Sequence, residues 1–407
     1  MSSSTTQDRQ PVKYVERSAY GTALGAFATV AAIGILALLL HFLAANLPHF
    51  GLLTSDNWPS KTLESPLAAV RWFFGDMTEA QFYKSDIASL GLLAGAGLAW
   101  LAARKNKRWS GAPLSYGSGL WPWVLAASSL SLLLSNIGFG WALSDGWQPT
   151  FVPFVSVAAA LVLVYGGGWK VCLTGAVLGA VTTTPVAMVL IALVTNPVGL
   201  PVVVSNVVAM SIGAALTFLL ARVLPWLSIP EQTPAQNPTA NKLPEPSKRS
   251  DVLWAARRVL SDFTETQFYA NELASIGVLF GVSIAFMLNP AVPGYGSNLI
   301  PHIIFAQALT SAIGVVLWRR WYRNGGWAAT YVSLVSVAPA TVLAYNGTWV
   351  SIVAGAVLGA VLGPPIARTI SGWLPKDFHP FIGNTMSMAI STTIVIPIVG
   401  IANSMIG

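Results

Sequence analysis

The sequence predicts an all-α polytopic membrane protein with about eleven transmembrane helices: one amino-terminal helix followed by two five-helix inverted repeats. Three observations predict this class, namely the composition, the length of the apolar runs and an internal repeat. Of the 407 residues only 9% are charged and 54% are hydrophobic, whereas ordinary soluble domains have about 25% and 45–50%. Such a chain has too few polar side chains to cover a water-soluble fold.

The apolar runs are about 20 residues long, which is the length that a helix needs to cross a bilayer core of about 30 Å. The first run is too long for a signal-peptide core of about 7–15 residues, so it is interpreted as a retained anchor helix. Transmembrane helices are predicted over residues 19–45, 78–103, 119–143, 150–166, 169–195, 200–227, 264–289, 299–319, 327–346, 348–371 and 382–406.

A proline-rich segment separates the two halves of the chain. Residues 229–250 contain five prolines among Gln, Asn, Thr and Lys, a composition that cannot bury enough apolar surface to fold and therefore predicts a flexible linker. The predicted organisation is a cytoplasmic tail (1–18), the first transmembrane helix with an external loop (19–63), repeat A (64–228), a cytoplasmic linker (229–250) and repeat B (251–407).

The distribution of Lys and Arg predicts the orientation, because positively charged short loops tend to stay cytoplasmic. This rule places the amino terminus and the basic clusters at 104–108 and 319–323 inside. The long first loop, with Lys61, Arg71 and Lys84, fits this rule less well. The prediction is a multi-pass protein of the plasma (inner) membrane with a cytoplasmic amino terminus and an external carboxy terminus.

The internal repeat begins at Asp76 and again at Asp262. DMTEAQFYKSDIASLG and DFTETQFYANELASIG share nine of sixteen positions, and GAVLGAV occurs both at Gly175–Val181 and at Gly355–Val361. Each copy contains five predicted helices, an odd number, so the second copy must enter the membrane from the opposite side. Inverted repeats recur in secondary transporters, where they support alternating access. By this fold-level analogy the chain is predicted to be a permease for a small polar or anionic solute.

The GAVLGAV segments and the residues after them are the first candidate binding pair. Prolines at 185, 364 and 365 are expected to break these helices and free backbone groups for a solute. The alternative is a tight, kinked packing face, since glycines spaced four apart allow close helix contact. The candidate residues here are Thr182, Thr183, Thr184 and Gly363.

Two further pairs of segments carry polar residues at matched positions. Ser156 is matched by Ser336, and Asn346 follows a tyrosine that is equally well explained as an interfacial anchor. Asn206 is matched by Asn384, next to Thr385, at the start of the last helix of each copy. Free N–H groups at such a helix start suit an anionic oxygen, but a simple helix cap is an equal alternative.

The repeated DxTExQFY segment is the last candidate. Gln81 and Gln267 lie beside aromatic residues, an arrangement suited to a sugar or a ring, and Glu79 and Glu265 complete the candidate set. The structural alternative is a capping box, with the preceding Asp residues as N-caps and the Glu residues three positions into the helix. No Asp or Glu lies centrally in an apolar run, so a buried carboxylate proton relay is disfavoured.

Other functions are weighed against transport. A membrane-embedded enzyme acting on a lipid-linked substrate would need a clustered acid, His or metal site, and a phosphotransferase-type sugar permease resembles this chain in architecture only. No catalytic residue, metal site or cofactor is predicted; Na⁺ coupling, uniport and channel behaviour stay open. The predicted partners are a small-molecule solute and the lipid bilayer, with no nucleic acid, because the +7 net charge lies in short clusters. A homodimer is left open.

Overall fold

The computed structural model describes residues 17–51, 54–55, 57–230 and 248–406, and within these ranges the chain is helical and contains no strand. The predicted all-helical class is therefore confirmed for the described chain. Most of the predicted cytoplasmic tail (1–16) and most of the predicted linker (231–247) lie outside the described residues.

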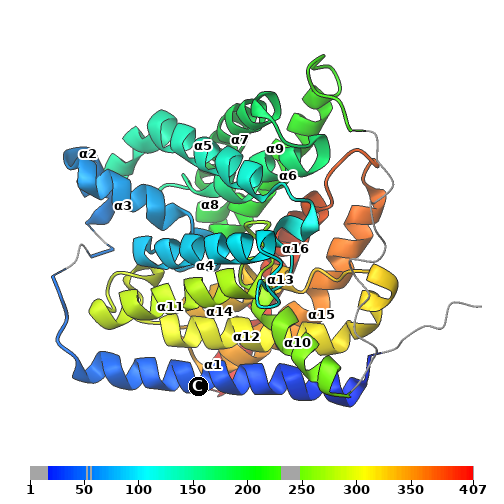
Figure 1. The fold of residues 1–407 in the computed structure, drawn as a ribbon. Helices are drawn as coiled ribbons and strands as arrows, with labels where there is room; N and C mark the ends of the chain where they lie inside the picture. Colours follow the sequence, from blue (N-terminus) through cyan, green and yellow to red (C-terminus); the bar gives the residue numbers. More distant parts are fainter. Residues whose placement is uncertain (1–16, 52–53, 56, 231–247, 407) are drawn as a thin grey trace, which may run out of the picture.

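The first half of the chain forms the following helices, numbered as in Figure 1: α1 (Ala19–Asn46), α2 (Trp58–Glu64), α3 (Pro66–Asp76), α4 (Asp86–Arg104), α5 (Trp121–Phe139), α6 (Val157–Tyr165), α7 (Trp169–Leu190), α8 (Asn196–Val198) and α9 (Val203–Ala221). The second half forms α10 (Lys248–Asp262), α11 (Glu272–Leu288), α12 (Ile300–Leu317), α13 (Tyr331–Leu334), α14 (Val337–Ala344), α15 (Trp349–Trp373) and α16 (Phe381–Ile406). Six helices of the first copy correspond in order to helices of the second: α3 to α10, α4 to α11, α5 to α12, α6 to α14, α7 to α15 and α9 to α16.

Eight helices of the described chain are long and apolar enough to cross a membrane, which supports a membrane-embedded protein. Three more of the predicted spans correspond to apolar helices of only 10–17 residues, at Val152–Tyr165, Glu272–Leu288 and Tyr331–Ala344. At a rise of about 1.5 Å per residue, such helices are shorter than the bilayer core.

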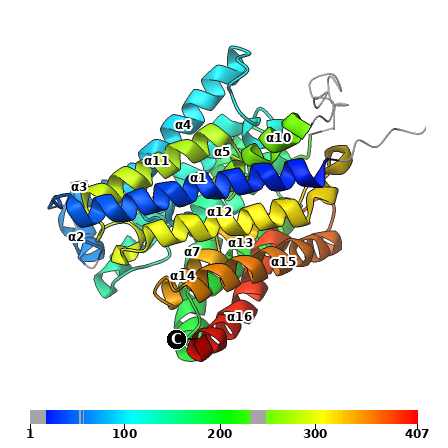
Figure 2. The same ribbon diagram turned by 90° about the horizontal axis from the view of Figure 1, so that it is seen from below.

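Helix α1 lies along one side of the bundle, where it packs against α10 and α12 (Figures 1 and 2). Its main contacts are therefore with the second copy, although it precedes the first copy in the chain. Helices α4 and α11, which are equivalent in the two copies, pack against each other at the centre of the molecule.

Glycines allow the close crossing of α4 and α11. A Cβ atom on Gly91 would overlap the carbonyl oxygen of Gly277, and a Cβ atom on Gly277 would overlap the carbonyl oxygen of Gly91. The next pair of equivalent glycines behaves in the same way: a Cβ atom on Gly95 would overlap the carbonyl oxygen of Leu273, and one on Gly281 would overlap the carbonyl oxygen of Ile87. The two helices therefore meet through equivalent residues of the two copies.

The helices predicted to begin at residues 78 and 264 begin later, at Asp86 and Glu272. The preceding DxTExQFY segments are largely non-helical, and they follow the short helices α3 and α10, which the apolar-run pattern did not predict. Phe82 and Phe268 adopt left-handed φ values of 65° and 62°, which interrupts any helix at this point.

The expected break at the GAVLGAV segments is wrong. Helix α7 continues through Pro185, and α15 continues through Pro364 and Pro365. Pro364 leaves the carbonyl of Ala360 without its helical donor, and the indole N–H of Trp318 in α12 donates to that oxygen at 2.9 Å. A side chain from a neighbouring helix therefore stabilises the uninterrupted form.

The symmetric helix breaks occur instead at Ser156 and Ser336. Both serines have non-helical backbone angles, and each hydroxyl donates back to the carbonyl four residues earlier, at 2.7 Å to Val152 and 2.6 Å to Val332. The break separates a short helical turn from α6 in the first copy and α13 from α14 in the second.

Candidate functional site

The two DxTExQFY segments meet at the centre of the molecule. Gln81 Nε2 donates to Gln267 Oε1 at 2.6 Å, and Gln267 Nε2 donates to Gln81 Oε1 at 2.8 Å. Each amide also donates to a backbone carbonyl of the other copy, at Phe263 and Met77 respectively. Since both side chains are buried and bonded to each other, this junction joins the two copies.

The acids of the repeat are not N-caps, as the capping-box alternative required. Asp76 is the last residue of α3 and Asp262 the last residue of α10. Both are fully buried, as are Glu79 and Glu265. Although no Asp or Glu lies centrally in an apolar run, these four carboxylates are buried, because they lie in and beside the loops that meet at the centre of the bundle.

In the first copy, Lys84 binds both acids of the repeat. Its Nζ contacts Asp76 and lies 2.6 Å from Glu79 Oε2, and it lies 3.4 Å from the centroid of the Trp72 ring. The other oxygen of Asp76 accepts hydrogen bonds from Thr150 at 2.8 Å and from Asn136 at 3.0 Å. This bonding orients the carboxylate toward the start of the broken helix.

In the second copy, Arg258 takes the place of the lysine. Its guanidinium contacts both Asp262 and Glu265. Asp262 also accepts from Ser311 at 2.5 Å and from Thr330 at 3.0 Å, and Thr330 is the residue equivalent to Thr150. Each of these two groups thus consists of two buried carboxylates and one cationic side chain.

Tryptophans complete the two acid groups in equivalent positions. Trp147 donates its indole N–H to Glu79 Oε1, and Trp327 donates to Glu265 Oε1 at 2.8 Å. Tyr295, from the second copy, donates to Glu79 Oε1 across the interface at 3.3 Å. Glu79 is therefore held by residues of both copies.

Glu79 also lines a narrow central cavity of about 40 Å³. Most of the residues that line the cavity form seven pairs, each made of equivalent residues from the two copies: Ala80 and Thr266, Phe82 and Phe268, Phe151 and Tyr331, Val155 and Val335, Val203 and Phe381, Val207 and Thr385, and Met210 and Met388. The cavity therefore lies between the two copies, and residues of both form its wall.

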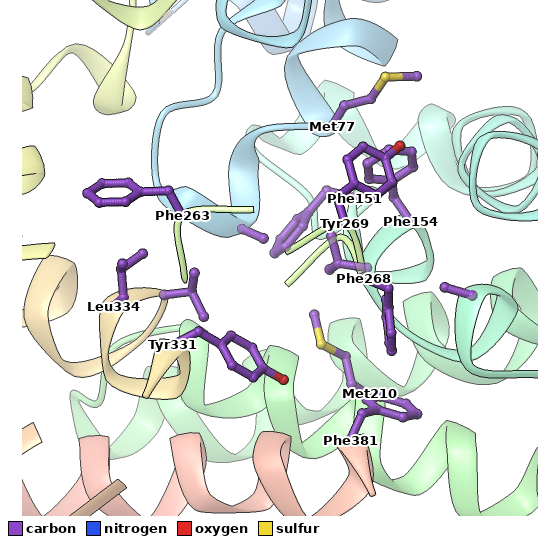
Figure 3. Packing of buried hydrophobic residues seen from close by; sticks show 14 of the residues in the cluster. Met77, Phe151, Phe154, Met210, Phe263, Phe268, Tyr269, Tyr331, Leu334 and Phe381 are labelled. Carbon is purple, nitrogen blue, oxygen red and sulfur yellow. The ribbon is translucent and has the colours of Figure 1, made fainter. Parts of the chain in front are cut away.

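Aromatic side chains form much of the cavity wall. Figure 3 shows Phe151 and Phe268 at the centre of the packed cluster, with Tyr331, Met210 and Phe381 nearby; the Phe268 and Phe381 ring centroids lie 5.7 Å apart. Asn206, which is 3% exposed, also lines the cavity, and its buried Oδ1 has no hydrogen-bond partner. The site therefore has one unused buried acceptor.

Two wider pockets flank the cavity. The Trp147 pocket, of about 420 Å³, includes Trp147, Pro201 and Ala344 and shares Phe82, Val202, Val203 and Tyr295 with the cavity wall. A single layer of side chains therefore separates the two spaces. The Trp327 pocket, of about 460 Å³, includes Trp327, Arg368, Ser371, Pro380 and Asn384.

The Trp327 pocket is separated from the cavity by more than one layer. Among the described residues none lines both spaces. Asn384, in the pocket wall, donates its amide N–H to the hydroxyl of Tyr331, in the cavity wall, at 3.1 Å. The two pockets contain equivalent residues, namely Trp147 and Trp327 as well as Val202 and Pro380. They differ in the number of side-chain layers that separate each pocket from the central cavity.

The structure brings only some of the predicted site residues to the cavity. Glu79, Asn206 and Thr385 line it, whereas Gln81, Gln267 and Glu265 lie beside it in the central junction, and Asn384 faces the Trp327 pocket. The remaining predicted residues lie elsewhere: Ser156 and Ser336 donate to carbonyls of the short helical segments before the breaks, Thr182 and Thr183 bond to carbonyls of α7, Thr184 pairs with Ser135, Gly363 packs against Ser333, and Asn346 is exposed in the turn before α15.

Several residues of the site were missed. Lys84 and Arg258 occupy non-equivalent sequence positions, so comparing the two copies position by position does not pair them. The sequence did contain one indication of paired charges near the repeat: the similarity of the two copies extends further toward the amino terminus, where Arg71 matches Arg257. These arginines bind Asp86 at 2.6 Å and Glu272 at 2.5 Å, which are also equivalent residues.

The described residues contain no cluster of three or more His, Cys, Asp or Glu side chains that could hold a metal ion. No family model, curated protein or solved structure matches this chain. Its own geometry therefore carries the functional argument.

Proposed function

We propose that this chain is an integral membrane transporter that moves a small polar solute by alternating access, with the solute bound between two inverted repeats. The observation that carries the proposal is the central cavity, whose wall consists mostly of equivalent residues from the two copies. A site between two inverted repeats can be opened toward either side by the same movement, made by one copy or the other.

The unequal closure of the flanking pockets supports this mechanism. One layer of side chains separates the cavity from the Trp147 pocket, whereas a hydrogen-bonded pair, Tyr331 and Asn384, stands between the cavity and the Trp327 pocket. With the predicted orientation, the Trp147 pocket is external and the Trp327 pocket, beside the basic residues near 320, is cytoplasmic. The structure then represents a state closer to opening outward.

Inversion of the copies is tested by labelling equivalent residues. Ser118 and Ser297 occupy matched positions before α5 and α12 and are at least partly exposed. Single cysteines at these positions, in a Cys172→Ala background, are expected to react with a membrane-impermeant maleimide from opposite sides of the bilayer. Reaction of both from the same side would rule out the inverted arrangement.

Transport is tested by flux into proteoliposomes across a panel of small polar solutes. Met210 lines the cavity, and Met210→Trp is expected to abolish flux of any solute that the wild type carries. Ile212 is on the outer surface of the same helix and is 37% exposed, so Ile212→Trp is the control and is expected to retain flux. The absence of wild-type flux and of any solute-induced stabilisation across the panel would contradict the proposal.

The sequence left the charge of the solute open between neutral and anionic. The cavity chemistry does not favour an anion, because a carboxylate is the one charged group in its wall among the described residues. The lipid-linked enzyme and the phosphotransferase permease gain no support from a specific feature of this site.

A further inference from the structure

Two buried groups, one of which contributes Glu79 to the wall of the central cavity, each have an excess of negative charge. Asp76 and Glu79 share the single cation Lys84, and Asp262 and Glu265 share Arg258. The neighbouring pairs of Arg71 with Asp86 and of Arg257 with Glu272 are internally balanced. An uncompensated charge in a low-dielectric interior is costly, so a bound cation near these groups is favoured.

Both carboxylate oxygens of Glu79 accept hydrogen bonds, which leaves about one acceptor site unused. Glu79 accepts from Lys84, Trp147 and Tyr295, all of which are donors in these contacts. Glu79 is also the one charged side chain in the cavity wall within the described chain. The charge that the site presents to a solute is therefore negative.

The cavity wall suits an organic cation better than a bare metal ion. Six aromatic rings surround the space, from Phe82, Phe151, Phe268, Tyr295, Tyr331 and Phe381. The faces of such rings attract cations electrostatically, most strongly where water is excluded. A hydrated inorganic ion would instead require several oxygen ligands at short range.

Asn206 provides an independent indication of a ligand with N–H donors. Its side chain is 97% buried (3% exposed), lines the cavity, and leaves the Oδ1 acceptor without a partner. A buried acceptor without a donor is destabilising, and a ligand that donates a hydrogen bond to it would remove this cost.

We propose that the central cavity binds a compact alkylammonium cation, whose N–H groups face Asn206 and Glu79 and whose alkyl part packs against the aromatic rings. The small volume of the cavity limits the ligand to a few heavy atoms in this conformation. This inference rests on the proposed transport function for its biological role, but the binding itself can be tested without any measurement of transport.

Three probes of nearly the same shape distinguish the charge preference: tert-butylammonium, tert-butyl alcohol and pivalate. Each is added to the purified full-length chain in detergent at constant ionic strength, and the melting temperature is measured. We expect tert-butylammonium alone to raise the melting temperature, saturably and by at least about 2 °C. An equal or larger shift with pivalate, or no shift with tert-butylammonium, would overturn the proposal.

Two variants locate the binding. Glu79→Gln is expected to abolish the tert-butylammonium shift, whereas Glu265→Gln, the equivalent change outside the cavity wall, is expected to reduce the shift much less. Phe151→Leu retains all charges and is expected to weaken apparent binding roughly fivefold, which keeps the proposal testable if the Glu79 variant does not fold. Retained binding in both cavity variants would overturn the assignment.

A proton is the competing compensating cation. If acidification stabilises the protein and no tert-butylammonium shift occurs, the excess charge is neutralised by protonation and the proposal fails. Failure of this kind leaves the Ser118 and Ser297 labelling result untouched, so it is distinguishable from failure of the transport mechanism.

Discussion

The acid groups of the two copies have the same carboxylates but obtain their cation from different places. In the first copy the cation is Lys84, located after the repeated motif, and Trp72 lies in α3 beside it. In the second copy position 84 corresponds to Ala270, and position 72 corresponds to Arg258, which supplies the cation. The two copies thus have the same charge balance, but the cation is at position 84 in the first copy and at the equivalent of position 72 in the second.

This comparison shows that the balance of charge, and not any one basic residue, is what the two copies share. Removing one partner of a buried ion pair leaves a charge that the interior cannot solvate. An exchange that moved the cation to a neighbouring position would keep the carboxylates paired. The duplicated halves therefore retain equivalent acids while their cations differ.

The largest expected effect follows from removing the lysine. Lys84→Ala should lower the free energy of unfolding by about 3–5 kcal/mol, because Asp76 and Glu79 lose their cation. Adding Trp72→Arg, which reproduces the arrangement of the second copy, should recover at least half of the loss. Unfolding in mixed micelles measures both; a double variant as unstable as the sum of the single changes would contradict the exchange.

The next effect concerns the glycine crossing, where the two copies are alike. Gly91→Ala places a Cβ against the carbonyl of Gly277 and should destabilise the protein by about 2–3 kcal/mol through overpacking. A Cβ atom added at Gly97, in the same helix, would have no neighbouring atom within 4 Å, so Gly97→Ala should leave the melting temperature unchanged or raise it. Equal tolerance of both changes would mean that α4 and α11 are not in close contact.

The glutamine junction should give a smaller, strongly non-additive effect. Gln81→Leu strands the amide of Gln267 and should cost about 1–3 kcal/mol. Changing both residues to leucine removes both sets of polar atoms, so the double variant should be less destabilised than the sum of the two single variants. Simple additivity in thermal unfolding would argue that the amides do not bond to each other.

The smallest effect is expected at the surface, where the copies also meet. Arg222 donates to Asp377 at 2.7 and 2.9 Å, and these hydrogen bonds hold the pKa of Asp377 below its ordinary value of 3.8. A carboxylate with a lowered pKa stabilises the fold above its unfolded-state pKa and loses this effect as the pH falls through the folded-state pKa.

Arg222→Gln should therefore reduce the melting temperature slightly at pH 7, since exposed ion pairs contribute little. The difference from wild type should shrink as the pH is lowered below about 4. A difference that stays constant over this range would show that the contact of Arg222 with the Phe378 ring, at 5.1 Å, matters more than the ion pair.

The membrane class and most helices could be predicted from the sequence because they depend on local properties. Runs such as 169–195 and 382–406 are apolar over a span that only lipid can accommodate, and α7 and α16 lie there. Glu79 could be selected as a candidate because it recurs within a repeat. Its role beside a cavity could not, because Tyr295 and Phe268, which share that cavity, lie far away in the sequence.

The sequence by itself determined that the chain is helical, apolar and internally repeated, since composition and periodicity are properties of neighbouring residues. The tertiary structure alone decided where the helices break and where the charges lie. Pro364 stays helical because Trp318 from another helix satisfies the freed carbonyl, and four carboxylates are buried because Lys84 and Arg258 reach them. Both outcomes depend on contacts between distant segments, which local propensity does not encode.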